Sequence, residues 1–136
     1  MNALNRFADP VYCVMRLIVG LLFASHGGQL ILGMFGGMKG PGSMLLQVGG
    51  WILLIGGFMI ALGLLTRLAA FISSGMMAVA YFMVHAPQNF FPIVNKGELA
   101  TFYCWVFLFM VFYGSGGWSL DAWIFKKSAP SAAPAT

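Results

Sequence analysis

Four long apolar segments, separated by short polar or glycine- and proline-rich stretches, dominate the hydropathy pattern of the chain. They cover about residues 11–32, 44–65, 68–85 and 98–117, the last ending near either Tyr113 or Gly117. Each is close to the ~20 residues with which a helix crosses ~30 Å of hydrocarbon. None shows the alternation of polar and apolar positions that is typical of a transmembrane barrel. The pattern therefore predicts an all-α fold, a polytopic membrane protein with an antiparallel bundle of four transmembrane helices.

The composition strengthens this prediction. Of the 136 residues, 60% are hydrophobic and only 7% are charged, whereas about a quarter of a soluble domain is charged. The first apolar segment lacks an A-x-A-like cleavage site and three further segments follow it, so we interpret it as a retained helix rather than a signal peptide. We expect residues 1–125 to form a single transmembrane domain. Residues 126–136, rich in small residues and proline, are predicted to be a disordered cytoplasmic tail.

The basic residues predict the orientation of the chain in the membrane. One side of the four predicted spans carries Arg6, Arg16, Arg67, Lys126 and Lys127, and the other carries Lys39 and Lys96. Since positive charge favours the cytoplasmic side, both termini are predicted to be cytoplasmic, with the loops 33–42 and 86–97 outside. The net charge of +4 is spread over helix ends and turns, which argues against a nucleic-acid-binding surface.

Small residues recur on the first three apolar segments at helical spacing. Because lipid tails are as apolar as leucine, helices in a membrane associate through close backbone approach, which such residues permit. The rows are Gly20, Ala24 and Gly28, then Gly49, Gly56 and Gly63, and finally Ala70, Ser74 and Ala78. We therefore expect three helices in backbone contact. The fourth segment is aromatic all round, which favours a surface facing lipid or a partner protein.

Three charged residues lie at the predicted cytoplasmic level. Arg16 lies about a turn and a half into the first helix, Arg67 lies in the short turn after the second, and Asp121 follows the fourth. An ion pair of Asp121 with either arginine would hold the end of the fourth helix against the bundle; the alternative is that the arginines extend into the headgroup layer. Cys13 and Cys104 are expected in opposite halves of the membrane, too far apart for a disulfide.

The outer level holds the candidate chemistry. His26 and Glu98 are the candidate catalytic residues, because a histidine beside a carboxylate can transfer the protons of a quinone-like redox reaction. His26, Gln29 and His85 are the candidate cofactor-binding residues; the sequence leaves the cofactor unknown, and a quinone is one candidate. The alternative for each is a hydrogen bond to a neighbouring helix.

Methionines in the first outer loop raise the question of a metal site. Met34, Met38 and Met44 could bind Cu(I) together with the histidines, but the sequence has no Met-x-Met or Cys-x-x-Cys motif. Methionine is also an ordinary apolar filler, and no metal site is predicted.

Three stretches carry a resemblance to a known family. RLIVGLLFASHGGQLILGMFGG (16–37), GGFMIALGLLTRLAAF (56–71) and GSGGWSLD (114–121) are similar, in order and spacing, to those of the DoxX family of bacterial and archaeal membrane proteins. The chain departs from the family pattern at Leu53, where an acidic residue is common, and near Gln29 and Leu30, where a basic residue is usual.

The resemblance implies a multi-pass protein of the bacterial or archaeal plasma (inner) membrane, in a family some of whose members look like subunits of thiosulfate:quinone oxidoreductase or of redox-stress complexes. The first hypothesis is an accessory or membrane-anchoring subunit of a quinone- or thiosulfate-linked redox system, whose partners are the lipid bilayer and a soluble or membrane oxidoreductase subunit. The alternatives are a quinone-reactive oxidoreductase subunit and a small-solute or metal permease. Whether the chain is itself an enzyme stays open, because family membership fixes architecture better than chemistry.

The predicted orientation can be tested by cysteine labelling. With Lys39→Cys, a membrane-impermeant thiol reagent added outside the cell is expected to label the protein, because position 39 lies in a predicted outer loop. With Arg67→Cys, no labelling is expected. The reverse pattern would place both termini outside.

Overall fold

The computed structural model describes residues 2–37 and 42–126, and every regular element in these ranges is helical. Predictions that concern Lys39, Lys127 or the rest of the tail fall outside them. The elements are α1 (Asn2–Asn5), α2 (Ala8–Leu32), the 3-10 turn η1 (Met34–Gly36), α3 (Met44–Trp51), the π-helical η2 (Ile52–Gly56), α4 (Gly57–Leu62), α5 (Thr66–Ala80), the π-helical η3 (Tyr81–His85), α6 (Pro92–Asn95), α7 (Glu98–Tyr113) and α8 (Leu120–Lys126).

Three helical segments are long and apolar enough to cross a membrane: α2, the continuous run Met44–Leu62, and the continuous run Thr66–His85. The helix α7 is apolar but has only 16 residues, about 24 Å at ~1.5 Å per residue. The prediction of an all-α polytopic membrane protein is confirmed.

The fourth helix stops at Tyr113, the nearer of the two ends that the sequence allowed, and not at Gly117. It ends at Tyr113 because Gly114 has φ 95°, a conformation that interrupts the helix and favours glycine. The chain then crosses back toward α2 and α4 before α8 begins.

The turn between the second and third spans also differs from the prediction, which placed it at Thr66 and Arg67. The second span ends at Leu62, and Gly63 (φ 72°) and Leu65 (φ 45°) are both left-handed. Thr66 is already the first residue of α5.

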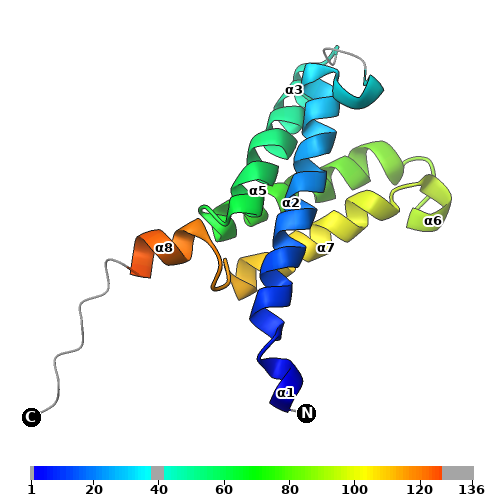
Figure 1. Cartoon of the computed structure of the whole chain (residues 1–136). Helices are drawn as coiled ribbons and strands as arrows, with labels where there is room; N and C mark the ends of the chain where they lie inside the picture. Colours follow the sequence, from blue (N-terminus) through cyan, green and yellow to red (C-terminus); the bar gives the residue numbers. More distant parts are fainter. Residues whose placement is uncertain (1, 38–41, 127–136) are drawn as a thin grey trace, which may run out of the picture.

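The spans form two antiparallel pairs. α2 packs along α3, η2 and α4, while α5 packs along α7. In the view of Figure 1 the second pair runs obliquely across the first, and α1 and α8 both lie toward the lower end of the α2–α4 pair.

Glycines bring α2 and α4 into backbone contact. A Cβ atom on Gly20 would come within 2.7 Å of the Gly57 carbonyl oxygen, and a Cβ on Gly57 would come 2.5 Å from the Ala24 amide nitrogen. Gly27 meets the backbone of Leu54 in the same way. The predicted packing through small residues is confirmed for the first two spans.

The third span approaches the others through side chains. Glycines 49 and 56 of the second span face the Met76 Cε and the Ser73 Oγ of α5, not its backbone. Ser74 instead connects α5 to α7, because its hydroxyl donates a hydrogen bond of 2.8 Å to the Cys104 carbonyl. The expectation of three helices in backbone contact is therefore wrong for the third helix.

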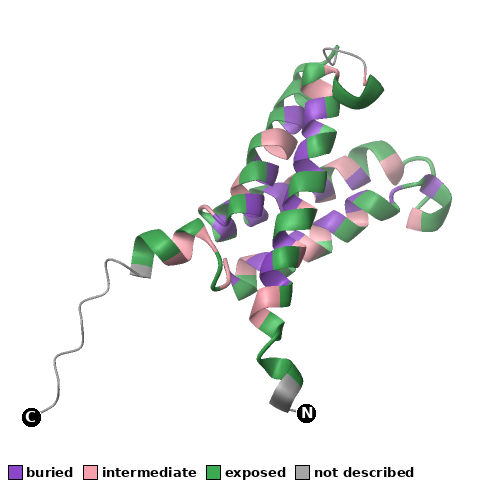
Figure 2. Ribbon diagram, viewed as in Figure 1, coloured by how far each residue is buried: buried purple, intermediate pink, exposed green. Residues whose placement is uncertain are grey.

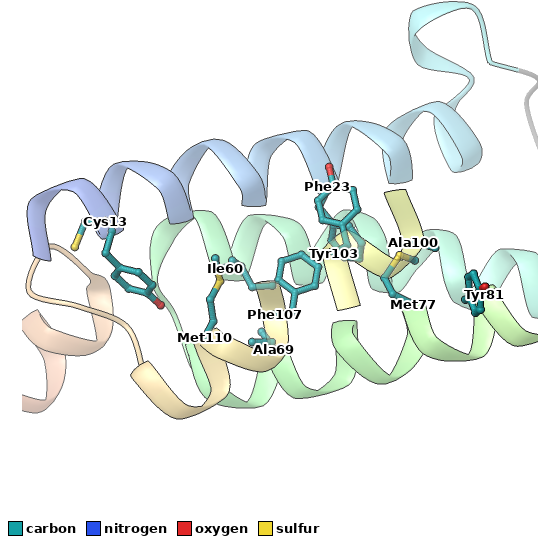
Figure 3. Close-up of a cluster of buried hydrophobic side chains, with 12 residues drawn as sticks. Cys13, Phe23, Ile60, Ala69, Met77, Tyr81, Ala100, Tyr103, Phe107 and Met110 are labelled. Carbon is teal, nitrogen blue, oxygen red and sulfur yellow. The ribbon is translucent and has the colours of Figure 1, made fainter. Parts of the chain in front are cut away.

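An aromatic cluster joins the two helix pairs. Phe23 of α2 and Phe107 of α7 are both 0% exposed, and their ring centroids lie 4.6 Å apart in an edge-to-face arrangement. The Tyr103 ring lies 5.1 Å from that of Phe23, and Figure 3 shows these side chains grouped between the helices. Buried residues follow the inner faces of the helices (Figure 2).

The fourth helix therefore has two faces, where the sequence predicted one uniform surface. Tyr103, Phe107 and Met110 belong to the core, whereas Phe102, Trp105, Phe109 and Phe112 point away from it and are exposed. Only the second set can face lipid or a partner.

The backbone contact between α2 and α4 predicts a position-specific effect of adding one methyl group. Gly57→Ala is expected to lower the free energy of unfolding in detergent by about 1–3 kcal/mol, because the new Cβ meets fixed backbone atoms. Gly75→Ala, where nothing lies within 4 Å of a Cβ, should leave stability unchanged or raise it by up to ~1 kcal/mol. Equal effects of the two substitutions would contradict this account of the packing.

Candidate functional site

Two polar clusters lie at opposite ends of the spans, and the first, near the chain termini, is built around Arg16. The Arg16 side chain is 2% exposed. Its Nη1 donates to the Ile60 carbonyl oxygen at 2.9 Å, and its Nη2 donates to the Trp118 carbonyl oxygen at 2.7 Å. A Cβ on Gly63 would collide with this guanidinium group. Arg16 thus connects α2 to the end of the second span and to the segment after α7.

Two carboxylates complete this junction through backbone amides. Asp121 accepts hydrogen bonds from the Leu65 and Thr66 amides at 2.7 and 2.9 Å, at the start of α5, where a carboxylate stabilises a helix. Asp9 accepts from the Gly117 amide, at 2.9 Å to Oδ2 and 3.1 Å to Oδ1. These bonds therefore hold residues 117–121 against α2 and the start of α5.

Hydrogen bonds to the backbone stand in place of the ion pairs expected between Asp121 and Arg16 or Arg67. Arg16 and Asp121 both bond to backbone groups, and no ion pair joins the side chains of residues 4–37 and 42–125. Arg67 is exposed and lines a shallow cavity together with Asp121. The physical reason is that helix ends and left-handed turns at this junction present unpaired amides and carbonyls, which the charged side chains satisfy first.

Both cysteines are free, as expected. Cys13 is buried and its sulfur accepts a hydrogen bond from the Trp118 amide at 3.4 Å. The Cys104 sulfur lies 3.6 Å from the Ser74 hydroxyl. Cys13 therefore packs where α2 meets the segment after α7, and Cys104 packs where α7 meets α5.

The second cluster surrounds a cavity of about 550 Å³ at the loop end of the spans, which we call the loop-end cavity. Residues from all four spans and from both loops line it: Phe23, His26, Gln29, Leu30, Gly37, Leu53, Met77, Ala80, His85, Lys96, Leu99, Ala100 and Tyr103. Figure 3 shows Phe23, Met77, Ala100 and Tyr103 of this wall. The cavity is largely apolar, with a few polar groups.

The cavity brings together three of the four candidate residues. His26, Gln29 and His85 all line it, although 59 residues separate the two histidines. Glu98 is exposed and does not line it, so the expected His26–Glu98 pair is not formed in this cavity. The cation present there is Lys96.

A hydrogen bond fixes which ring nitrogen of His85 carries the proton. His85 Nδ1 lies 3.0 Å from the Asn95 carbonyl oxygen, which can only accept, so Nδ1 carries the proton. In the neutral ring, Nε2 then keeps a free lone pair. The ring also stacks on Tyr81, with centroids 6.3 Å apart.

His26 is held differently. Its ring meets the Tyr103 ring edge-on at 6.2 Å, and the structure gives it no hydrogen-bond partner among the side chains and backbone groups of residues 2–37 and 42–126. Its nitrogens are therefore free to bind a ligand.

Asn95 organises the second loop, a role that the sequence did not predict. This side chain is 4% exposed; its Nδ2 donates to the Asn89 carbonyl at 2.6 Å and to the Tyr81 hydroxyl at 3.3 Å, and its Oδ1 accepts from the Gly97 amide at 2.7 Å. The Tyr81 hydroxyl in turn donates to the Phe90 carbonyl. A loop asparagine gives no sequence signal of such a role.

Both π-helical segments border the cavity. η2 contributes Leu53 and η3 ends at His85. A π turn shifts the side chains that follow it around the helix axis, and such turns are frequent at functional sites. Leu53 makes the wall apolar at the position where the sequence departs from the DoxX pattern.

Metal ligands are sparse. No group of three or more His, Cys, Asp or Glu residues that could hold a metal ion occurs among the residues that the structure describes. Met34 lies against Gly28, while Met38 falls outside the described ranges.

The comparisons agree with this architecture. The family model described as DoxX matches residues 11–86, and the chain belongs to the DoxX family of membrane proteins. A protein of Haemophilus influenzae described as uncharacterized is 41% identical over 134 residues, which cover 93% of this chain and all of that protein. No solved structure matches the chain.

The junction near the termini generates a graded prediction for stability. Asp121→Ala is expected to lower the free energy of unfolding by about 1–2 kcal/mol, because the Leu65 and Thr66 amides lose their acceptor. Asp121→Asn keeps one acceptor oxygen and should fall between wild type and Asp121→Ala. Denaturant titration in detergent measures both, and an unaffected Asp121→Ala protein would rule out this capping role.

Proposed function

We propose that this DoxX protein is the membrane subunit of a quinone-linked redox system and that the loop-end cavity binds the quinone ring. The observation that carries the proposal is the meeting of His26 and His85 in one cavity of about 550 Å³. Ligand sites in proteins are typically cavities of ~300–1,000 Å³ with apolar walls and a few polar groups. This cavity has both properties.

The lining suits a flat ring with a carbonyl oxygen at each end. Leu30, Leu53 and Leu99 offer apolar surface for the faces of the ring. His26, Gln29 and Lys96 offer N–H groups for its oxygens. When bound, a quinone supplies a redox couple, because its reduction takes up two electrons and two protons.

The protein can exchange one of those protons directly. Because the Asn95 carbonyl keeps the proton of His85 on Nδ1, the Nε2 lone pair can accept a proton from a phenolic hydroxyl and return it. Asn95 thus acts as a positioning residue for His85. Glu98, the other residue expected to carry protons, has no part in this proposal.

The partner follows from the same reasoning. The electrons are exchanged with an oxidoreductase subunit, which is the association that the resemblance to DoxX implied. The exposed aromatic face of α7 (Phe102, Trp105, Phe109, Phe112) is available for such a subunit. A purely anchoring role needs no histidine-lined cavity, so the geometry favours the quinone-reactive interpretation over the anchoring one.

The proposal predicts that a short-chain benzoquinone binds the purified protein and that His26 contributes to the affinity. His26→Ala is expected to weaken binding roughly fivefold, the effect of one lost hydrogen bond of ~1 kcal/mol. Titration calorimetry in detergent micelles measures the dissociation constant.

Glu98→Gln is the matched control, since it changes a polar residue of the same region that does not line the cavity, and its affinity should equal that of wild type. Failure of the wild-type protein to bind the quinone, or equal binding by His26→Ala, would refute the proposal.

A further inference from the structure

The turn before the fourth span exposes a cluster of large apolar side chains. Phe90, Phe91, Ile93 and Val94 are 61–77% exposed, and they lie in α6 and in the two residues before it. We call residues 90–94 the apolar turn. We propose that the apolar turn is embedded in lipid at the boundary between headgroups and acyl chains. Part of the loop 86–97, which the charge distribution places outside the membrane, then lies within it.

In water the surface of the apolar turn would be costly. Burial of one such side chain contributes ~1.5–3 kcal/mol relative to its exposure, and the four side chains stay exposed in the folded chain. Aromatic and aliphatic side chains beside a membrane favour the headgroup boundary. Because the turn joins two membrane spans, the nearest apolar phase is the bilayer itself. This interaction with lipid is independent of any ligand in the loop-end cavity.

The short fourth span gives a second reason for this placement. α7 has 16 residues, about 24 Å at ~1.5 Å per residue, whereas the hydrocarbon layer is ~30 Å thick. α6 packs against α7 and lies at the loop end of that helix (Figure 1). The apolar turn therefore lies where it extends the apolar surface of the fourth span toward the full thickness of the membrane.

Hydrogen bonds inside the apolar turn permit contact with lipid. An unpaired amide or carbonyl in hydrocarbon costs several kcal/mol, so irregular backbone is tolerated there only where its polar groups are paired. The Phe91 carbonyl accepts from the Val94 and Asn95 amides, both at 3.0 Å. The Phe91 amide donates to the Asn89 Oδ1, also at 3.0 Å. These polar groups of the turn thus need no water.

Polar contacts on the inner side determine which side of the turn faces away from the protein. The buried Asn95 donates from Nδ2 to the Asn89 carbonyl at 2.6 Å, and the Tyr81 hydroxyl donates to the Phe90 carbonyl. The Asn95 carbonyl also lies 3.0 Å from the Nδ1 of His85. The turn is therefore polar toward the protein and apolar on the opposite side, as interfacial membrane anchors are.

Polar residues on both sides limit the depth of the apolar turn. Gln88 and Asn89 precede it, Lys96 and Glu98 follow it, and all four are exposed. Charged side chains near a membrane keep their charged ends at the interface. The turn therefore reaches the headgroup boundary and not the middle of the bilayer. A second copy or a partner protein could cover the same side chains, but only lipid also accounts for the short fourth span.

Spin labelling measures where the apolar turn lies. A nitroxide is attached at Ile93→Cys in the full chain, in which Cys13→Ser and Cys104→Ala remove the two native thiols, and the protein is reconstituted in phosphatidylcholine vesicles. Oxygen concentrates in lipid, whereas a nickel chelate stays in water. The logarithm of the ratio of oxygen to nickel accessibility is expected to be positive at position 93. Gln88→Cys, in the same loop, is the matched control and should give a negative value.

Two results would overturn the lipid contact. A negative value at position 93 would place the apolar turn in water. Low accessibility to both reagents would mean that protein covers the turn, and dipolar broadening that disappears on dilution with unlabelled protein would identify a second copy as that cover. Equal ratios at positions 88 and 93 would contradict the proposed boundary between them.

A second position guards against a local disturbance by the label. Val94→Cys is exposed in the same turn, and its label is expected to show the same preference for oxygen. The far-UV circular dichroism spectrum of each labelled protein should equal that of wild type. A folded protein with a positive value at 93 and a negative value at 94 would count against an embedded turn.

Discussion

The contact between the backbones of α2 and α4 is the constraint on which the rest of the structure depends. In a bilayer, burial of apolar side chains gives little reason for helices to associate, because lipid solvates them equally well. Gly20 and Gly57 instead allow each helix to reach the backbone of the other, where dispersion forces between closely packed atoms are strongest. This contact turns Phe23 toward Tyr103 and Phe107 of α7, and it brings Arg16 within reach of the Ile60 carbonyl.

The two ends of the molecule use polar groups for different purposes. Near the termini, the side chains of Arg16 and Asp121 form hydrogen bonds with backbone groups of the junction. These two charged groups therefore hold elements together and are not available to a ligand. At the loop end, His26 has no such partner and His85 uses only one nitrogen. Backbone hydrogen bonds thus engage the charged groups near the termini, whereas histidine nitrogens at the loop end are available to a ligand. For that reason the proposed function is assigned to the loop end.

The sequence predicted the helices well and the contacts less well. Hydropathy is a property of whole segments, so the spans and the glycine contact of the first two helices could be predicted. The end of α7 was narrowed to Tyr113 or Gly117, and the choice between them depends on the conformation of Gly114. His26, Gln29 and His85 were identified as polar residues of one level, but the fold leaves Glu98 exposed and outside the lining of their cavity, which a shared level does not reveal. Asn95 was missed because its role depends on three partners that only the folded loop provides.

The hydrogen bonds of Asp121 have a consequence for how the protein is made. The carboxylate accepts from the amides of Leu65 and Thr66, which lie 56 and 55 residues earlier in the chain. During synthesis the third span therefore leaves the ribosome long before the group that caps it. Until Asp121 emerges, the first turn of that span must be satisfied by water or by the insertion machinery. A nascent chain that stops before this residue keeps those amides exposed, and such a defect is a mark by which membrane quality control can tell an unfinished molecule from a complete one.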